Sequence, residues 1–319
     1  MSAPRIVSLL PSATEIVAAL GFADALVGRS HECDYPDEVE DLPVCTEPKV
    51  DPRGSSEEIH RSVSALLAQT LSVYRVDAGR LRALEPTHLV TQVQCEVCAV
   101  SLEEVEEALA AWTDASARPR LTALNPASLA DVFDDIGRVA AALGVPERGA
   151  RLVARLRERM DRIAAAASGL PRPRVATIEW LSPLMTAGNW MPELVEMAGG
   201  ENLFGAAGAH SPWLSWDALR SEDPDVLVVF PCGFPLERVE SEIGLLTSLP
   251  GWNGLAAVAA GRVFLAEANQ YFNRPGPRLA ETLEILAEIL HPDAFGFGHE
   301  GRAWRRLRPP PARPRGVAS

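Results

Sequence analysis

Residues 5–21 read RIVSLLPSATEIVAALG, and residues 174–204 read RVATIEWLSPLMTAGNWMPELVEMAGGENLF. Each stretch begins with an apolar run typical of a buried strand, passes through a turn or polar loop, and continues with the spacing of an amphipathic helix. Between them, residues 145–168 carry apolar side chains at spacings of three and four, from Leu152 to Ala167, which predicts one long helix. The sequence therefore predicts two α/β lobes joined by a helix, with a cleft for a small ligand between them.

Short apolar runs alternate with helical patterns on both sides of the long helix. This alternation predicts a mainly parallel sheet flanked by helices in each lobe. We expect a first lobe at residues 1–144, a linking helix at 145–170, a second lobe at 171–295 and a disordered basic tail at 296–319.

Capping patterns mark where several helices should begin. Ser12 and Glu15 are spaced as a capping box, and so are Ser55 and Glu58, whose helix we expect to reach Ser72. Asn125 followed by a proline predicts the start of the helix before the linking helix.

Composition and charge restrict the class of protein. The formal net charge of -13 and the pI of about 5.0 imply no broad basic face, so we expect no nucleic-acid partner. No apolar run is long enough to cross a bilayer, so we expect no membrane insertion. The chain begins with no secretory signal pattern and has five cysteines, an odd number, which together predict a cytoplasmic location.

Loops that follow the predicted strands hold the candidate ligand-binding residues, because ligands of parallel sheets bind beyond the carboxyl ends of the strands. These loops combine thiols, polar groups and aromatic side chains. The candidates are His31, Cys33, Tyr35, Glu47, Gln94, Cys95, Trp180, Trp190, Trp213, Cys232, Tyr271 and Phe272. A corrin or porphyrin has a broad apolar face with polar edges, which such aromatic side chains can cover.

The cysteines permit three interpretations. Cys95 and Cys98 form a CxxC pair before a capped helix, and they become a metal site if Cys33 and His31 converge on them. The alternatives are thiol redox chemistry and small, buried side chains in a reducing compartment. We expect at least three of the five thiols to face the cleft. No sequence-local pattern pairs a nucleophile with a base, which argues against an enzyme.

Five segments carry a resemblance to a known family. They are residues 6–15 (IVSLLPSATE), 34–36 (DYP), 81–86 (LRALEP), 199–204 (GGENLF) and 274–278 (RPGPR). In this order, around one linking helix, they resemble the class III solute-binding proteins of ABC importers, and within them a leaderless, cysteine-rich relative of the vitamin B12-binding branch. The resemblance spans about residues 5–292.

The resemblance implies two α/β lobes, a rigid linking helix and a cleft that encloses a flat cofactor or metal chelate. In the B12 branch a tryptophan corresponds to Trp213, and an aromatic loop corresponds to residues 270–272. Family members dock on a permease through a surface glutamate of each lobe. Here Asp217 stands at the second of these positions and Gly79 at the first. Residues 55–75 form an insertion relative to the family.

Together these features predict a non-catalytic protein that binds a corrinoid such as cobalamin, or a related metal chelate, for uptake or intracellular handling. A bound metal ion and an ABC permease partner are compatible with this hypothesis. The alternative is a metal- or thiol-dependent redox enzyme that uses the cysteines of the cleft.

Overall fold

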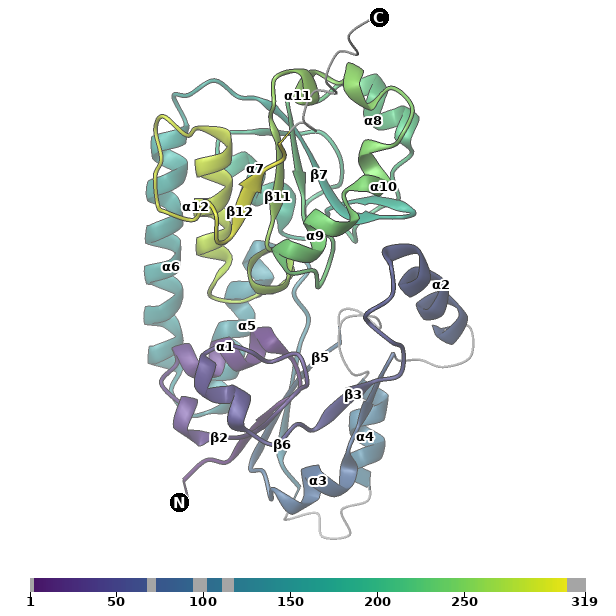
Figure 1. Ribbon diagram of the computed structural model, residues 1–319. Helices are drawn as coiled ribbons and strands as arrows, with labels where there is room; N and C mark the ends of the chain where they lie inside the picture. The colour runs from purple at the N-terminus through teal and green to yellow at the C-terminus, as the bar shows by residue number, and fades with distance from the viewer. Residues whose placement is uncertain (1–2, 68–72, 94–101, 111–117, 309–319) are drawn as a thin grey trace, which may run out of the picture.

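A computed structural model describes residues 3–67, 73–93, 102–110 and 118–308. These residues form two lobes joined by helix α6 (Pro146–Ala167), with the first lobe below and the second above in Figure 1. The predicted α/β fold with a linking helix is confirmed. The domain limits at residues 144 and 171 stay a prediction.

The first lobe is built on a parallel sheet of strand order β2-β1-β5-β6. Its central strand β1 is buried throughout, as expected for a strand that is covered on both faces. A separate antiparallel ribbon pairs β3 with β4. The strands are β1 (Ile6–Ser8), β2 (Leu26–Arg29), β3 (Thr46–Pro48), β4 (Tyr74–Val76), β5 (His88–Gln92) and β6 (Arg120–Leu124), and the helices are α1 (Pro11–Ala19), α2 (Ser56–Leu67), α3 (Ala78–Ala83), α4 (Leu102–Ala110) and α5 (Leu129–Ala142).

The second lobe has a larger sheet of order β12-β11-β10-β7-β8, and β9 also pairs with β7. Strands β11, β10, β7 and β9 are parallel, whereas β12 and β8 are antiparallel additions. The strands are β7 (Arg174–Leu181), β8 (Leu184–Thr186), β9 (Glu201–Asn202), β10 (Val226–Val229), β11 (Val263–Ala266) and β12 (Trp304–Arg306), and the helices are α7 (Met191–Met197), α8 (Trp216–Glu222), α9 (Leu236–Glu242), α10 (Gly244–Thr247), α11 (Ala256–Ala259) and α12 (Leu279–Leu290).

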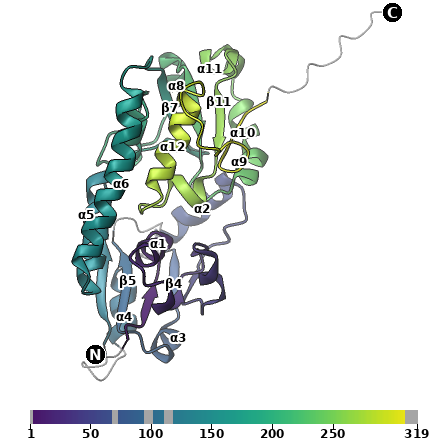
Figure 2. The same cartoon turned by 90° about the vertical axis from the view of Figure 1, so that its left-hand side faces the viewer.

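Helix α6 runs along the side of both lobes and packs on α5 of the first lobe and on α7 and α12 of the second (Figures 1 and 2). Its buried stripe is the predicted one and consists of Leu152, Leu156, Met160, Ile163 and Ala167. Gly149 lets α5 approach closely, because a Cβ at this position would lie 2.5 Å from the Cβ of Ala140. The 22 residues of α6 span about 33 Å, which is long enough to support both lobes.

Three expectations about local structure were wrong. Residues 304–306, which we assigned to a disordered tail, form β12 and pair with β11, so ordered structure extends beyond residue 296. Helix α1 has Leu10 as its N-cap without a side-chain cap, and Glu15 instead accepts a hydrogen bond from Arg274 of the other lobe. Helix α5 is capped by Ser128 rather than by Asn125.

Candidate functional site

An ion cluster joins the two lobes where the loop after β2 meets the loop after β11. Arg274 donates to Glu15 Oε1 at 3.2 Å and, from Nη2, to Asp34 Oδ2 at 2.9 Å. Asn269 donates to the same Asp34 oxygen at 3.1 Å. The side chains of Arg274 and Glu15 are only 4% and 2% exposed, so this contact between lobes is almost dry. Because buried charges need partners, the cluster fixes how these loops face each other.

Arg278 extends this cluster toward aromatic rings of both lobes. Its guanidinium lies 4.3 Å from the ring centroid of Tyr35 and 4.4 Å from that of Tyr271. Such stacking of a cation on aromatic faces is favourable. It ties Tyr35 of the first lobe to Tyr271 of the second. We call Glu15, Asp34, Arg274 and Arg278 the inter-lobe ion cluster.

Protonation in the inter-lobe ion cluster is unusual. Burial raises the pKa of Glu15 to about 7, although Arg274 and Arg278 oppose the rise. Among the described residues, Glu15 Oε2 and Arg278 Nη1 are buried without a hydrogen-bond partner. Buried polar atoms of this kind are groups that the polar edge of a ligand can satisfy.

His31 and its neighbours form a second polar group on the first lobe. The Nδ1 atom of His31 lies 2.8 Å from Thr46 Oγ1, and its ring lies 5.0 Å from that of Tyr74. Burial, with a smaller contribution from Arg29, lowers the pKa of His31 to about 4, so the imidazole is neutral at physiological pH. Tyr74 donates to Glu32 at 2.9 Å.

Glu47 lies farther along the β3–β4 ribbon, where it is exposed and pairs with Arg75. Among the described residues, no hydrogen bond or ion pair joins Glu47 to the inter-lobe ion cluster.

The cysteines do not gather as predicted. Cys33 is 1% exposed and accepts a hydrogen bond from Thr14 at 3.0 Å, and Cys45 is fully buried in the core beneath β1. Cys232 is half-buried after β10. Cys33 is therefore corrected from a ligand or metal contact to a core residue, since its side chain points into its own lobe. Among the described residues no group of three or more histidine, cysteine or acidic side chains could hold a metal.

Gln94, Cys95 and Cys98 lie outside the described residues. Two of the three described thiols, Cys33 and Cys45, are buried, so the expectation that at least three of the five face the cleft now depends on Cys232, Cys95 and Cys98 and stays a prediction.

The aromatic candidates divide into an exposed and a buried set. Met185 pairs across the backbone with Trp180 on one side and with Trp213 on the other. Because side chains that lie opposite one another in a sheet share a face, Trp180 and Trp213 lie on one face, which we call the aromatic surface. Trp213 is 60% exposed, and Trp180 is half-buried against Phe234.

Trp190 and Phe272 are corrected to core residues. The indole of Trp190 is buried and donates to the Phe272 carbonyl at 3.1 Å, and the Phe272 ring stacks on Phe230 with centroids 4.5 Å apart. Tyr271 is also 6% exposed, beneath Arg278. These three side chains shape the loop after β11 rather than offer free surface.

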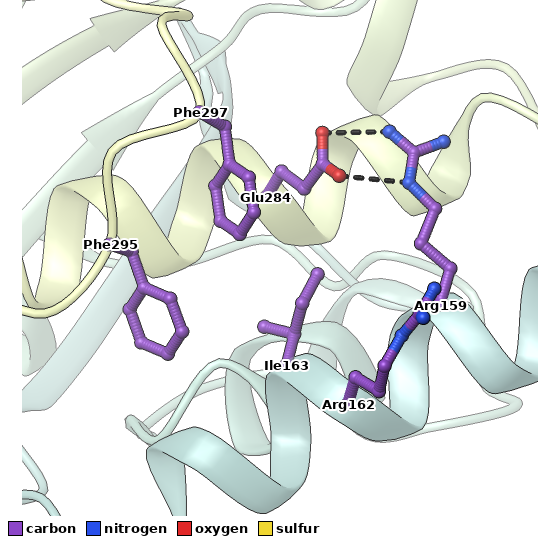
Figure 3. A pocket seen from close by; sticks show the side chains of 6 residues that line it. All are labelled: Arg159, Arg162, Ile163, Glu284, Phe295 and Phe297. Carbon is purple, nitrogen blue, oxygen red and sulfur yellow. Dashed lines mark hydrogen bonds and ion pairs between the residues drawn. The ribbon is translucent and has the colours of Figure 1, made fainter.

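A hollow lies on the outer side of the molecule, between α6 and α12. It has a volume of about 370 Å³ and is lined by Arg159, Arg162, Ile163, Glu284, Phe295 and Phe297. Figure 3 shows Arg159 paired with Glu284 along one wall and the two phenylalanines along the other. None of these residues belongs to the predicted site, which lies at the ends of the strands.

The sequence placed the loop that carries Asp34 at the candidate site, but it did not predict the inter-lobe ion cluster. Glu15 was assigned to a helix cap, and Arg274 and Arg278 were noted only as part of a family segment. The available signal was that two arginines stand four residues apart directly after a predicted strand-end loop.

Comparison with known proteins finds relatives of similar length, of which three are described here. An uncharacterized ABC transporter substrate-binding lipoprotein of Bacillus subtilis is 25% identical, over 91% of this chain and 81% of the relative. A vitamin B12-binding protein of Vibrio parahaemolyticus is 24% identical, over 89% and 87%. The crystal structure of a periplasmic heme-binding protein from Pseudomonas aeruginosa superimposes with a TM-score of 0.68 and 23% identity, over 91% and 94%.

These relatives overturn the expected cytoplasmic location, because they are described as a lipoprotein of an ABC transporter and as a periplasmic protein. The reducing-compartment argument from an odd number of cysteines was too weak to decide this. No helix among the described residues has the length and apolar character needed to cross a membrane.

The model of the periplasmic binding protein family matches residues 6–269. This family consists of solute-binding proteins, so the expectation of a protein that is not an enzyme is confirmed. The resemblance to class III solute-binding proteins and their vitamin B12-binding branch is likewise confirmed. With its two lobes, single linking helix and matching sequence, the chain belongs to the periplasmic binding protein family.

Proposed function

We propose that the protein binds a corrinoid, or another flat metal chelate, between its lobes and delivers it to an ABC importer on the outer side of the cytoplasmic membrane. The observation that carries this proposal is the exposed Trp213 on the aromatic surface. Its indole is 60% exposed, unusual for a large apolar side chain, and it stands where the B12 branch has a tryptophan.

The chemistry of the inter-lobe region suits such a ligand. A corrin presents a broad apolar face, which Trp180 and Trp213 can cover, and a rim of polar amide groups. Glu15 Oε2 and Arg278 Nη1 are buried without hydrogen-bond partners in this closed arrangement, and opening of the inter-lobe ion cluster would make them available to that rim. The neutral imidazole of His31 is a possible axial ligand to the metal.

Sequence relatives favour a corrinoid over heme. The Vibrio protein that is 24% identical over most of the chain is named a vitamin B12-binding protein, whereas the heme-binding neighbour supports the fold alone. The permease partner is part of the same proposal. Asp217 at the start of α8 has a side chain that is 92% exposed, as docking on a permease requires.

Titration of the purified protein with cyanocobalamin, cobinamide and hemin, followed by calorimetry and absorbance, tests the ligand. We expect micromolar or tighter binding of a corrinoid, a free energy of about -8 kcal/mol or stronger. Trp213→Ala should weaken this binding by about 1 kcal/mol or more through loss of stacked area. Phe297→Ala is the matched control, because Phe297 is an exposed aromatic residue in the hollow beside α6. Tight binding of hemin alone would redirect the proposal to heme, and no binding of any of the three would refute it.

A further inference from the structure

The segment that follows β3 leaves the first lobe and reaches the second. Arg238 of α9 donates from Nη1 to the Pro52 carbonyl at 2.6 Å and from Nη2 to the Gly54 carbonyl. These bonds hold the approach to α2 against α9, and both views show α2 beside the second lobe, away from α6 (Figures 1 and 2). The helix lies within residues 55–75, the segment that the resemblance led us to expect as an insertion.

The first turn of α2 is bound by the opposite lobe, in addition to the capping box that Ser55 and Glu58 form within the segment itself. Glu242 accepts hydrogen bonds from the backbone N–H of Ser56, at 2.9 Å, and from its hydroxyl. A carboxylate at a helix N-terminus satisfies free N–H groups and interacts well with the helix dipole. Ser56 is fully buried, whereas its neighbour Glu57 is exposed, so the second lobe is what buries this turn.

The same helix occupies the aromatic surface. Ile59 packs against the apolar cluster of the second lobe to which Trp180 belongs, and the His60 ring stands edge-on to Trp213 at 5.3 Å. Helix α2 also contacts β7, the strand that carries Trp180. The contacts with Glu242, Arg238, Trp213 and strand β7 therefore form one continuous interface between this segment and the second lobe.

We propose that residues 51–67 form a strap that covers part of the aromatic surface and competes with the ligand for it. Trp213 keeps 60% of its surface exposed beside the docked His60 ring, which stands edge-on to it at 5.3 Å. A flat ligand that extends over the part covered by His60 therefore has to displace the strap. The free energy of strap docking is then subtracted from that of ligand binding, which lowers the apparent affinity and favours ligands large enough to displace the strap. The competition rests on the proposed function, whereas docking of the strap does not.

Hydrogen–deuterium exchange of the protein without added ligand tests docking. Glu242→Ala removes the carboxylate that holds Ser56 to the second lobe and leaves the capping box of Ser55 and Glu58 intact. We expect exchange of the amides of residues 56–60 to become about tenfold faster. Glu240→Ala is the matched control, because Glu240 lies on the same helix and pairs with Arg305 inside the second lobe. Arg238→Ala, which removes the bonds to Pro52 and Gly54, should act like Glu242→Ala. Circular dichroism checks that each variant is folded. Exchange that is equally fast in wild type and in both variants would overturn docking.

Titration of the same proteins with cyanocobalamin and cobinamide tests competition. We expect Glu242→Ala to bind a corrinoid about tenfold more tightly than wild type and Glu240→Ala to match wild type. A saturating corrinoid should also speed exchange of residues 56–60 in wild type. Faster exchange without a gain in affinity would overturn the competition. If none of the proteins binds either corrinoid, the proposed function fails together with the competition, while the exchange experiment still decides whether the strap is docked.

Discussion

Arg274 of the second lobe donates to Asp34 of the first lobe over 2.9 Å, although 240 positions separate them in the chain. The contact fixes the loop after β2 to the loop after β11, and these two loops carry five of the twelve candidate residues. The Arg274 side chain is 4% exposed and that of Asp34 26%, so an opening of the lobes that breaks this contact exposes a buried guanidinium.

Loss of the Arg274 charge should destabilise the protein strongly. Arg274→Met keeps most of the side-chain volume but leaves Glu15 and Asp34 without their cation, and we expect a loss of about 3–5 kcal/mol at pH 8. Arg162→Ala is the control, since its exposed pair with Glu158 is worth less than about 0.5 kcal/mol. Urea unfolding measures both, and equal losses would show that the cluster does not hold the lobes.

Glu15 should make stability depend on pH. Burial raises its pKa to about 7 from 4.5, so between these values the folded protein keeps a proton that the unfolded chain releases. The folded state then binds more protons, and stability falls as pH rises through this window, by up to about 3 kcal/mol.

Glu15→Gln removes this contribution. The difference in unfolding free energy between wild type and Glu15→Gln should change between pH 5 and pH 8, with wild type losing more as the pH rises. Urea unfolding at several pH values measures it. The charges of Arg274 and Arg278 lower the pKa of Glu15, whereas the charge of Asp34 raises it. Parallel curves for the two proteins would mean that the arginines keep this pKa near its ordinary value.

Features that depend on local periodicity could be predicted from the sequence, and features that depend on distant partners could not. The buried stripe of α6 followed directly from apolar spacing. Glu15 has the spacing of a capping box, but in the folded protein it pairs with Arg274, which is 259 positions away and which no local pattern reveals. Strand β12 likewise gains its order from pairing with β11, which no local pattern reveals.

The candidate site was predicted at the level of loops but not of side-chain direction. The loops after β2 and β11 do meet, as the rule for parallel sheets implies. Within a loop, however, neighbouring side chains point to different sides. Asp34 reaches the other lobe, whereas the adjacent Cys33 points into its own core. Residue type and position in a loop do not decide between these directions.

The three described thiols should react at different rates. Burial raises the pKa of Cys45 to about 11 and also raises that of Cys33, so both are protonated and shielded at neutral pH. Cys232 is half-buried, and we expect it to react with iodoacetamide well before the other two. Peptide mapping by mass spectrometry assigns each site, and alkylation in urea provides the fully reactive reference. Early modification of Cys33 in the folded protein would return it to the list of ligand contacts.

Phe272 and Trp213 should separate stability from ligand binding. Phe272 is fully buried against Phe230, and Phe272→Ala should cost about 3–5 kcal/mol of stability by leaving a cavity. Trp213 is largely exposed, so Trp213→Ala should change stability by less than about 0.5 kcal/mol and act on corrinoid binding instead. Urea unfolding and titration with cobinamide, performed on both variants, measure the two effects. If Phe272→Ala proved stable and weakened binding, the loop after β11 would present Phe272 to the ligand, as the sequence first suggested.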